Sequence, residues 1–207
     1  HRYMSTEYGN YKTDSDESDY YSASLAHSLI QLLQQDMGAR GVLSLASRWN
    51  CPLMWSHYAN EHRGLCIEYS TKEANFSNLG KVNYRGSRAI RLSDVFAWRV
   101  GKDVNAASRV REAIYFSKAP DWKYEREWRD LTDKAGVRPA PAPPSAILFG
   151  HRCDATIIRT VVRLFENAEF PVRFYVVRPL EDSFRLRRHR VDADEILSDK
   201  VRLPSGW

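Results

Sequence analysis

Residues 124–131 read Tyr124-Glu125-Arg126-Glu127-Trp128-Arg129-Asp130-Leu131, and we interpret this stretch as a β-strand. Side chains alternate along a strand, so Glu125, Glu127 and Arg129 are expected on one face. Two carboxylates that meet on one surface raise the pKa of one member. A carboxylate in that position can act as a base or accept hydrogen bonds from sugar hydroxyls. Arg129 on the same face can either clamp a phosphate or neutralise the pair.

An isolated pair of acids at this spacing is usually a solvated strand face with one salt bridge. Here the aromatic residues Trp122, Tyr124 and Trp128 surround the acids, which favours a lined binding site. The acids are therefore candidate catalytic residues, and a purely structural role is the alternative.

A second cluster, Trp55-Ser56-His57-Tyr58, lies on a helical turn that begins at Pro52. His57 is a candidate proton carrier or hydrogen-bond donor, although a lone histidine on a mostly buried helix is more often a core residue. We interpret the two clusters as the halves of one pocket. His57 and His62 lack the i, i+4 spacing by which a helix presents two metal ligands, so no metal site is predicted.

The chain of 207 residues is 43% hydrophobic and 12% aromatic, enough to bury a full core. The predicted fold class is α/β (α+β), a single domain with a mixed central sheet and flanking helices. Residues 1–22 are expected to be a mobile or truncated segment, residues 23–207 one globular domain, and the Pro-rich residues 138–144 a loop inside it. Strands are expected at 42–46 (buried), 65–69, 81–84, 146–149, 172–177 and 184–190, and helices at 22–38, 105–116 and 154–167, with a turn at 78–80.

No apolar run approaches the roughly 20 residues of a membrane helix, and no signal peptide is evident, so a soluble, cytoplasmic protein without membrane contact is expected. The three cysteines, Cys51, Cys66 and Cys153, form no C-x-x-C pair. Their odd number and wide separation argue against a disulfide framework and a structural zinc site.

The formal net charge is +5, and a basic run lies near the end of the chain at Arg185, Arg187, Arg188 and Arg190. Such a run can attract the phosphates of RNA, DNA or a dinucleotide. The favoured interpretation is a half-exposed edge strand whose cations discourage pairing with other strands.

Several segments in order resemble the bacterial family called domain of unknown function 2971. These segments are Leu53-Met54-Trp55-Ser56-His57-Tyr58-Ala59, His62-Arg63-Gly64-Leu65-Cys66-Ile67-Glu68-Tyr69, Phe116-Ser117-Lys118, Trp122 to Arg129, and Ile147-Leu148-Phe149-Gly150. The family implies an α/β domain. Its members more distantly resemble ADP-ribosyltransferase-like domains, in which a late glutamate, often in an E-x-E pair, holds the ribose of NAD.

This resemblance implies that Glu127 holds the nicotinamide ribose and stabilises the charge that develops as nicotinamide leaves, while Glu125 positions the acceptor. It further implies that His57, Tyr58 or Trp55 contacts the nicotinamide and that Lys118 or Arg129 meets the pyrophosphate. Trp55, His62, Lys118 and Arg129 are thus the candidate cofactor-binding residues. Two other classes stay open: a defence protein that acts on RNA or DNA, and a non-enzymatic interaction module.

Overall fold

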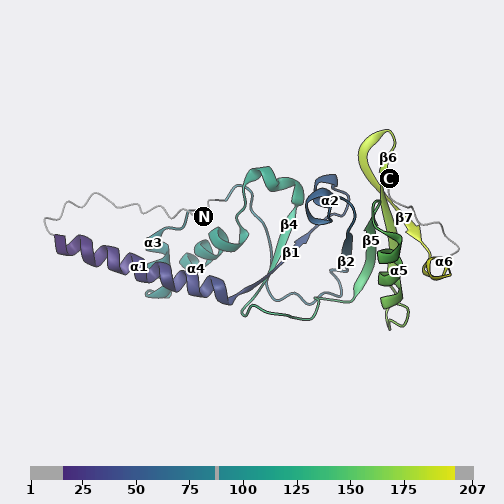
Figure 1. Cartoon of the computed structure of the whole chain (residues 1–207). Coiled ribbons are helices and arrows are strands. Elements are labelled where there is room, and N and C mark those ends of the chain that lie inside the picture. The colour runs from purple at the N-terminus through teal and green to yellow at the C-terminus, as the bar shows by residue number, and fades with distance from the viewer. Residues whose placement is uncertain (1–15, 87–88, 199–207) are drawn as a thin grey trace. The chain divides into compact units, whose positions relative to one another are not determined.

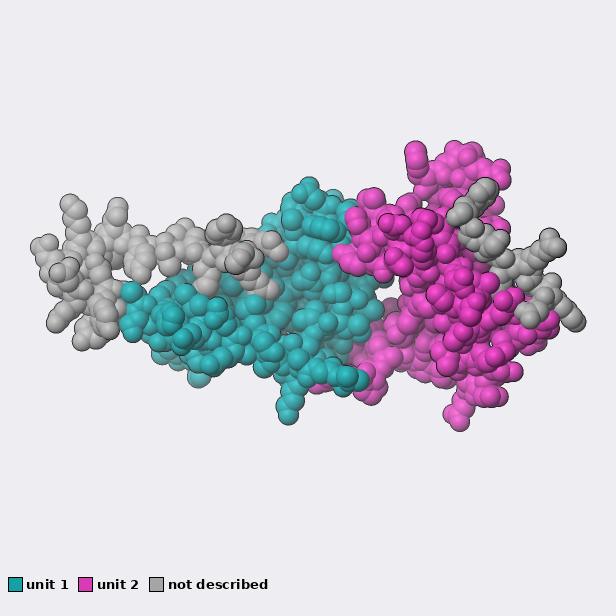
Figure 2. Space-filling model, viewed as in Figure 1, with its two compact units in different colours: residues 1–46, 77–137 teal, residues 47–76, 138–207 magenta. Residues whose placement is uncertain are grey.

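The computed structural model describes residues 16–86 and 89–198 of the chain (Figure 1). Contacts within the chain divide it into two compact units, shown in different colours in Figure 2. Unit 1 comprises residues 1–46 and 77–137, and unit 2 comprises residues 47–76 and 138–207. Each unit is thus assembled from two separate segments. That residues 23–207 form one domain stays a prediction, and residues 1–15 of the predicted mobile segment lie outside the described residues.

Unit 1 combines helices with a three-stranded antiparallel sheet of order β1-β4-β3. Its elements are α1 (Asp16–Ala39), β1 (Gly41–Ala46), β3 (Leu79–Lys81), α3 (Leu92–Arg99), α4 (Val104–Arg111), a π-helix (Glu112–Phe116), a 3-10 helix (Pro120–Glu125) and β4 (Glu127–Thr132).

The first helix and the strands of unit 1 differ in detail from the sequence prediction. Helix α1 begins at Asp16 rather than near Ser22. Strand β1 was predicted to be buried, but it is an edge strand and Val42 is 48% exposed. The strand predicted at 81–84 lies at Leu79–Lys81 instead, so the turn predicted at 78–80 is largely strand.

The helix predicted at 105–116 is confirmed as α4 with the π-helix that continues it. The Asp103 carboxylate caps α4 by accepting hydrogen bonds from the backbone N–H groups of Asn105 and Ala106. Helix α3 was not predicted. Arg91 at its N-cap makes no side-chain capping hydrogen bond, so the usual start signal of a helix is missing.

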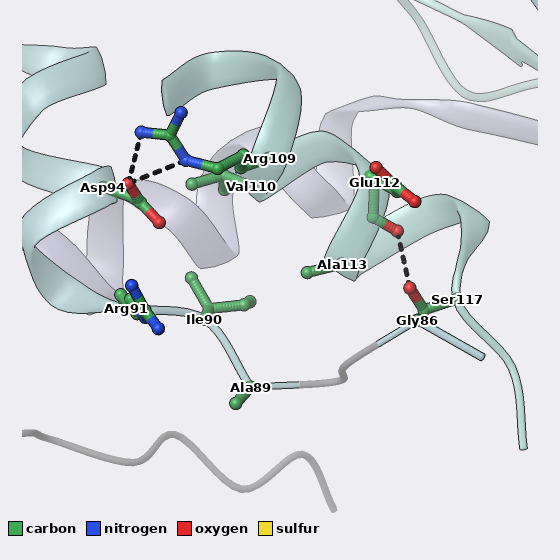
Figure 3. A pocket seen from close by; sticks show the side chains of 10 residues that line it. All are labelled: Gly86, Ala89, Ile90, Arg91, Asp94, Arg109, Val110, Glu112, Ala113 and Ser117. Atoms are coloured by element: carbon green, nitrogen blue, oxygen red, sulfur yellow. Dashed lines mark hydrogen bonds and ion pairs between the residues drawn. The ribbon is translucent and has the colours of Figure 1, made fainter. Parts of the chain in front are cut away.

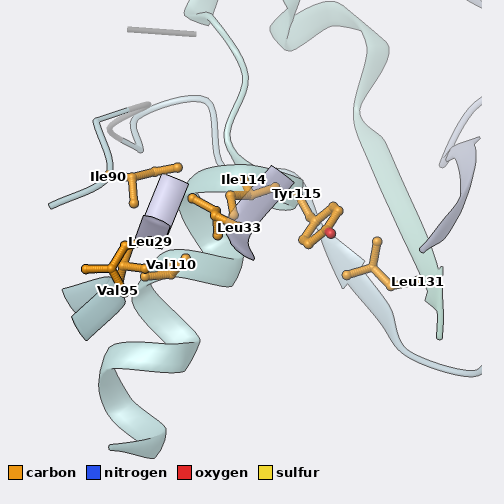
Figure 4. Packing of buried hydrophobic residues seen from close by; sticks show 8 residues of the cluster. All are labelled: Leu29, Leu33, Ile90, Val95, Val110, Ile114, Tyr115 and Leu131. Atoms are coloured by element: carbon orange, nitrogen blue, oxygen red, sulfur yellow. The ribbon is translucent and has the colours of Figure 1, made fainter. Parts of the chain in front are cut away.

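The core of unit 1 lies where α1 packs on α3, α4 and the π-helix (Figure 4). Leu29 and Leu33 come from the predicted apolar stripe of α1, and they meet Val95 of α3 and Val110 of α4. Of the predicted stripe, Leu29, Leu33 and Met37 thus face the core, whereas Leu25 and Leu32 are exposed.

Unit 2 contains a four-stranded mixed sheet of order β2-β5-β6-β7, in which only the β5–β6 pair is parallel. Its elements are α2 (Pro52–Tyr58), β2 (Leu65–Tyr69), β5 (Pro144–Gly150), α5 (Ala155–Leu164), β6 (Arg173–Leu180), β7 (Ser183–Val191) and α6 (Ala193–Leu197). The predicted α/β fold with a mixed sheet and flanking helices is confirmed. The structure adds a second sheet, that of unit 1.

Alternation along β5 builds the two halves of the unit 2 core. Ile147 and Phe149 pack in one cluster with residues of α5, whereas Ala146 and Leu148 pack in the other with Trp55 of α2. The two faces of a strand can serve two layers because successive side chains point in opposite directions. One helix therefore covers each face of β5.

Two further features of unit 2 bear on the predictions. β7 is an edge strand of the sheet, as its alternating apolar and charged residues indicated. Residues 138–143 form no helix or strand, and they open the second segment of unit 2, which runs from Arg138 to Trp207. That residues 138–144 form a loop inside a single domain stays a prediction. Among the described residues, no helix is long and apolar enough to cross a membrane.

Replacing Phe149 by alanine should lower the free energy of unfolding by about 3–5 kcal/mol, because the removed ring leaves a cavity in a fully buried position. Phe184→Ala is the matched control, since Phe184 is 96% exposed. Urea denaturation followed by circular dichroism measures both variants. Equal losses in the two would contradict the assigned core.

Candidate functional site

The two acids of the Glu-x-Glu pair do not lie on one strand. Glu125 ends the 3-10 helix Pro120–Glu125, and β4 begins at Glu127. Between them Arg126 adopts a left-handed conformation, with φ of 49°. The predicted strand from Tyr124 is therefore wrong at its start, because Pro120 opens a helical turn and Arg126 reverses the backbone.

The two carboxylates nevertheless meet, because both bind the ammonium group of Lys118. Lys118 Nζ donates a short hydrogen bond to Glu125 Oε2 and a second, of 3.1 Å, to Glu127 Oε2. Glu125 is only 2% exposed and Glu127 only 6%. Lys118 also lies over the Trp122 ring, 5.0 Å from its centroid. A lysine rather than strand alternation thus brings the acids together.

Arg129 completes this cluster, which we call the buried charge network (Lys118, Glu125, Glu127 and Arg129). Its Nε donates to Glu127 Oε1 at 2.8 Å and its Nη2 to Oε2 at 3.0 Å. Its Nη1 donates to the backbone carbonyl of Tyr115 at 2.5 Å. Of the two roles considered for Arg129, the structure shows neutralisation of Glu127, through a two-pronged pairing that fixes the carboxylate plane.

The network sets the charge of Glu127. Burial raises the pKa of Glu127, but hydrogen bonds from Arg129, Lys118 and Ser44 outweigh burial and lower it to about 2. The pKa of Lys118 is raised: burial lowers it, but the hydrogen bonds to Glu125 and Glu127 prevail. The pKa of Glu127 is therefore lowered rather than raised, and the carboxyl stays ionised near neutral pH. A role for the pair as a base or as a hydrogen-bond acceptor stays a prediction.

Unit 1 also contains a pocket of about 450 Å³ (Figure 3). Its wall includes Ile90, Val110 and Ala113 together with the charged residues Arg91, Asp94, Arg109 and Glu112. Arg109 donates to Asp94 through Nε at 3.1 Å and Nη2 at 2.7 Å. The pocket reaches Ser117, the chain neighbour of Lys118. Sequence reasoning missed the charged lining because α3, which carries Asp94, was not predicted.

The predicted site residues on α2 have unequal surroundings. Trp55 is buried in the core of unit 2, and its Nε1 donates to the Trp49 carbonyl at 2.6 Å. His57 and Tyr58 are exposed, with their rings edge to face at a centroid distance of 6.3 Å. His57 is thus not the core histidine that the alternative interpretation described. These residues belong to unit 2 and Glu127 to unit 1, and a common pocket stays a prediction.

His62 lies beyond α2, where its ring stacks on Trp55 at a centroid distance of 6.1 Å and an interplanar angle of 10°. It also lies against His151, which the sequence did not single out, at a centroid distance of 4.7 Å. The part of the chain that the structure describes contains no group of three or more histidine, cysteine or acidic side chains suited to a metal ion.

Residues 54–129 match the family model described as "Protein of unknown function (DUF2971)". The matched segment runs from α2 in unit 2 to β4 in unit 1 and contains the whole buried charge network together with Trp55, His57, Tyr58 and His62. No curated protein and no solved structure matches the chain. The comparisons thus support the resemblance to this family, and the likeness to ADP-ribosyltransferases stays a prediction.

The pKa of Glu127 predicts how stability depends on pH. The carboxyl has an ordinary pKa of 4.5 and a pKa of about 2 in the fold. Its contribution, on the order of 3 kcal/mol, is therefore present above about pH 4.5 and lost as the pH falls towards 2. Acid titration of the unfolding free energy should show a shallower fall for Glu127→Gln than for the unchanged protein. Glu73→Gln, at an exposed position, should leave the slope unchanged, and a slope unaffected by Glu127→Gln would contradict the assignment.

Proposed function

We propose that this chain is a nucleotide-binding enzyme that transfers ADP-ribose from NAD and that Glu127 is the carboxylate facing the ribose. The observation that carries this proposal is an ionised, buried glutamate held by Lys118 and Arg129, in the same unit as a pocket of nucleotide size whose wall includes Ser117, the chain neighbour of Lys118. The family resemblance adds the expectation of a ribose-binding glutamate but does not by itself supply the activity.

The free-energy cost of burying the charges of the network favours a functional role. Ions removed from water lose hydration, and well-packed apolar residues of similar volume often stabilise a fold as well as a buried ion pair does. Glu125, Glu127 and Lys118 are all largely buried. Stability alone therefore does not explain why unit 1 gathers these charges at one place.

The chemistry suits a fixed negative charge. NAD supplies a glycosidic bond from ribose to a nicotinamide that leaves with the bonding electrons, so positive charge develops on the ribose. The Glu127 carboxylate stabilises that charge because it is ionised and held in place before the reaction. Arg129 fixes its orientation through two hydrogen bonds. Glu127 acts here by electrostatics and hydrogen bonding, with no proton transfer.

The hydrogen bond from Lys118 to Glu127 is the one that a ligand can replace. Glu127 Oε2 accepts both from Arg129 and from Lys118, and the Lys118 bond is the longer of the two at 3.1 Å. When a ribose hydroxyl donates to this oxygen, Lys118 keeps its bond to Glu125 and offers its remaining donors to a phosphate. Glu125 in this arrangement holds Lys118 and positions the acceptor.

The pocket suits a nucleotide in size and charge. Its volume of about 450 Å³ falls within the roughly 300–1,000 Å³ that is typical of small-molecule sites. Arg91 supplies a cation for a phosphate group, and Ile90 and Val110 supply apolar surface for a base. Arg109 in the same wall is paired with Asp94.

RNA or DNA binding, as in a defence protein, is the second candidate. Arg185, Arg187 and Arg190 are exposed on the edge strand β7, where they can reach a phosphate backbone. Arg188, the fourth member of the predicted run, instead pairs with Glu68 at 3.0 Å and lies over the Tyr175 ring. The basic surface therefore has three exposed arginines rather than four.

Calorimetric titration with NAD, together with an assay for released nicotinamide, tests the proposal. The unchanged protein should bind NAD saturably and release nicotinamide, and Glu127→Gln should reduce the release at least a hundredfold by removing transition-state stabilisation. Arg91→Gln, which alters the pocket wall and leaves the network intact, should weaken NAD binding several-fold. Lys123→Met, at an exposed lysine of the same 3-10 helix, is the matched control and should change neither.

Two outcomes would contradict the proposal. Absence of NAD binding, with retention of RNA that falls steeply with salt and is lost on replacing the three exposed arginines, would replace the proposal by the second candidate. Absence of both would leave an interaction module.

A further inference from the structure

The turn after α2 has an unusual backbone. Asn60, Glu61 and His62 follow one another with φ of 45°, 52° and 66°, the left-handed region that non-glycine residues rarely adopt. Three such residues in succession persist only where the surrounding structure holds them. Backbone strain of this kind is often found beside binding sites.

The end of β5 holds the turn. The Arg152 N–H donates to the His62 carbonyl at 3.1 Å, and the Gly150 N–H donates to the Gly64 carbonyl at 3.0 Å. A Cβ atom on Gly150 would lie only 2.0 Å from the His62 oxygen, so this close approach requires glycine. The sequences His62-Arg63-Gly64 and Gly150-His151-Arg152 are thus docked backbone to backbone.

Docking brings two tilted histidine rings together, each with an unpaired ring nitrogen. The ring centroids of His62 and His151 lie 4.7 Å apart at an interplanar angle of 53°. The Nδ1 atoms of both rings are buried, and neither has a hydrogen-bond partner among the described residues. His62 Nε2 lies 3.4 Å from Ser56 Oγ, a long contact. Buried polar atoms in native proteins are nearly always paired, so these two Nδ1 atoms lack the partner that such atoms normally have.

The charges around the two rings favour an anion. Burial lowers the pKa of both histidines. For His62 the charges of His151 and then Arg152 lower it further, and for His151 the charges of Arg152 and then Arg178 do so. The Glu61 carboxylate of the turn is shared between Arg63 at 2.7 Å and Arg152 at 3.6 Å. A metal cation would be repelled here.

The neighbouring strands add positive charge. Arg178 of β6 lies directly opposite Arg187 of β7, and neither makes an ion pair within the described part of the chain. Like charges in directly opposed positions destabilise a sheet unless a counter-charge joins them. The carboxyl ends of the parallel strands β5 and β6 are also where open α/β sheets bind ligands.

We propose that His62, His151, Arg152 and Arg178 form a binding site for a phosphate-type oxyanion in unit 2. The two Nδ1–H groups donate to the anion, and the guanidinium groups balance its charge. The amides at the start of α5 are not the donors, because the Asp154 carboxylate caps that helix by accepting from the Thr156 N–H at 2.7 Å. This inference does not rest on the function proposed for unit 1.

Titration of the full chain with inorganic phosphate, followed by proton–carbon NMR of its six histidine rings, tests the site. The signals of His62 and His151 should shift saturably, while that of the exposed His27 should not move. His62→Gln, His151→Gln and Arg178→Gln should each weaken binding at least tenfold. His27→Gln is the matched control, and Arg178 is exposed, so its replacement should preserve folding.

Adenosine monophosphate in place of inorganic phosphate distinguishes the source of the anion. Tighter binding of the nucleotide identifies a phosphate ester as ligand, and equal binding identifies free phosphate. Shifts of equal size in all six rings, no saturable shift with either probe, or unchanged affinity in all three site variants would overturn the proposal.

Discussion

The shared ammonium of Lys118 is the interaction on which the candidate site of unit 1 depends. Without it, two buried carboxylates would repel each other across a short distance. The Lys118 backbone also donates to the Asn83 carbonyl, and the Glu127 N–H donates to the Tyr84 hydroxyl. The residues after the π-helix, the segment after β3 and the start of β4 are therefore held together around one charge cluster.

Local sequence rules identified the regular elements well and the sites only in part. Strand β2 was predicted with its observed bounds, and α5 and β6 nearly so, because periodicity and capping residues are local signals. Strand alternation predicted that Glu125 and Glu127 form a pair, but the two residues do not lie on one strand. The cation that joins them, Lys118, comes from the segment between the π-helix and the 3-10 helix, and no periodic pattern encodes such a contact.

The contact between the His62 and His151 rings is a second example of a contact that local sequence patterns do not encode. The residues lie far apart in the sequence, and their meeting depends on a glycine that removes one Cβ atom. Non-glycine residues with positive φ in the described chain are Asn60, Glu61, His62, Lys102 and Arg126. All but Lys102 flank or form one of the two candidate sites. The places where the backbone departs from its local preference thus coincide with the two candidate sites, with the exception of Lys102.

The central claim is that unit 1 keeps Glu127 ionised inside a buried charge network. Carbon NMR of the glutamate Cδ atoms during an acid titration measures this charge directly, with Glu127→Gln to assign the signal. The account predicts that the Glu127 signal remains that of a carboxylate well below pH 4.5, in keeping with a pKa of about 2. A protonation step of the folded protein at or above pH 4.5 would contradict it.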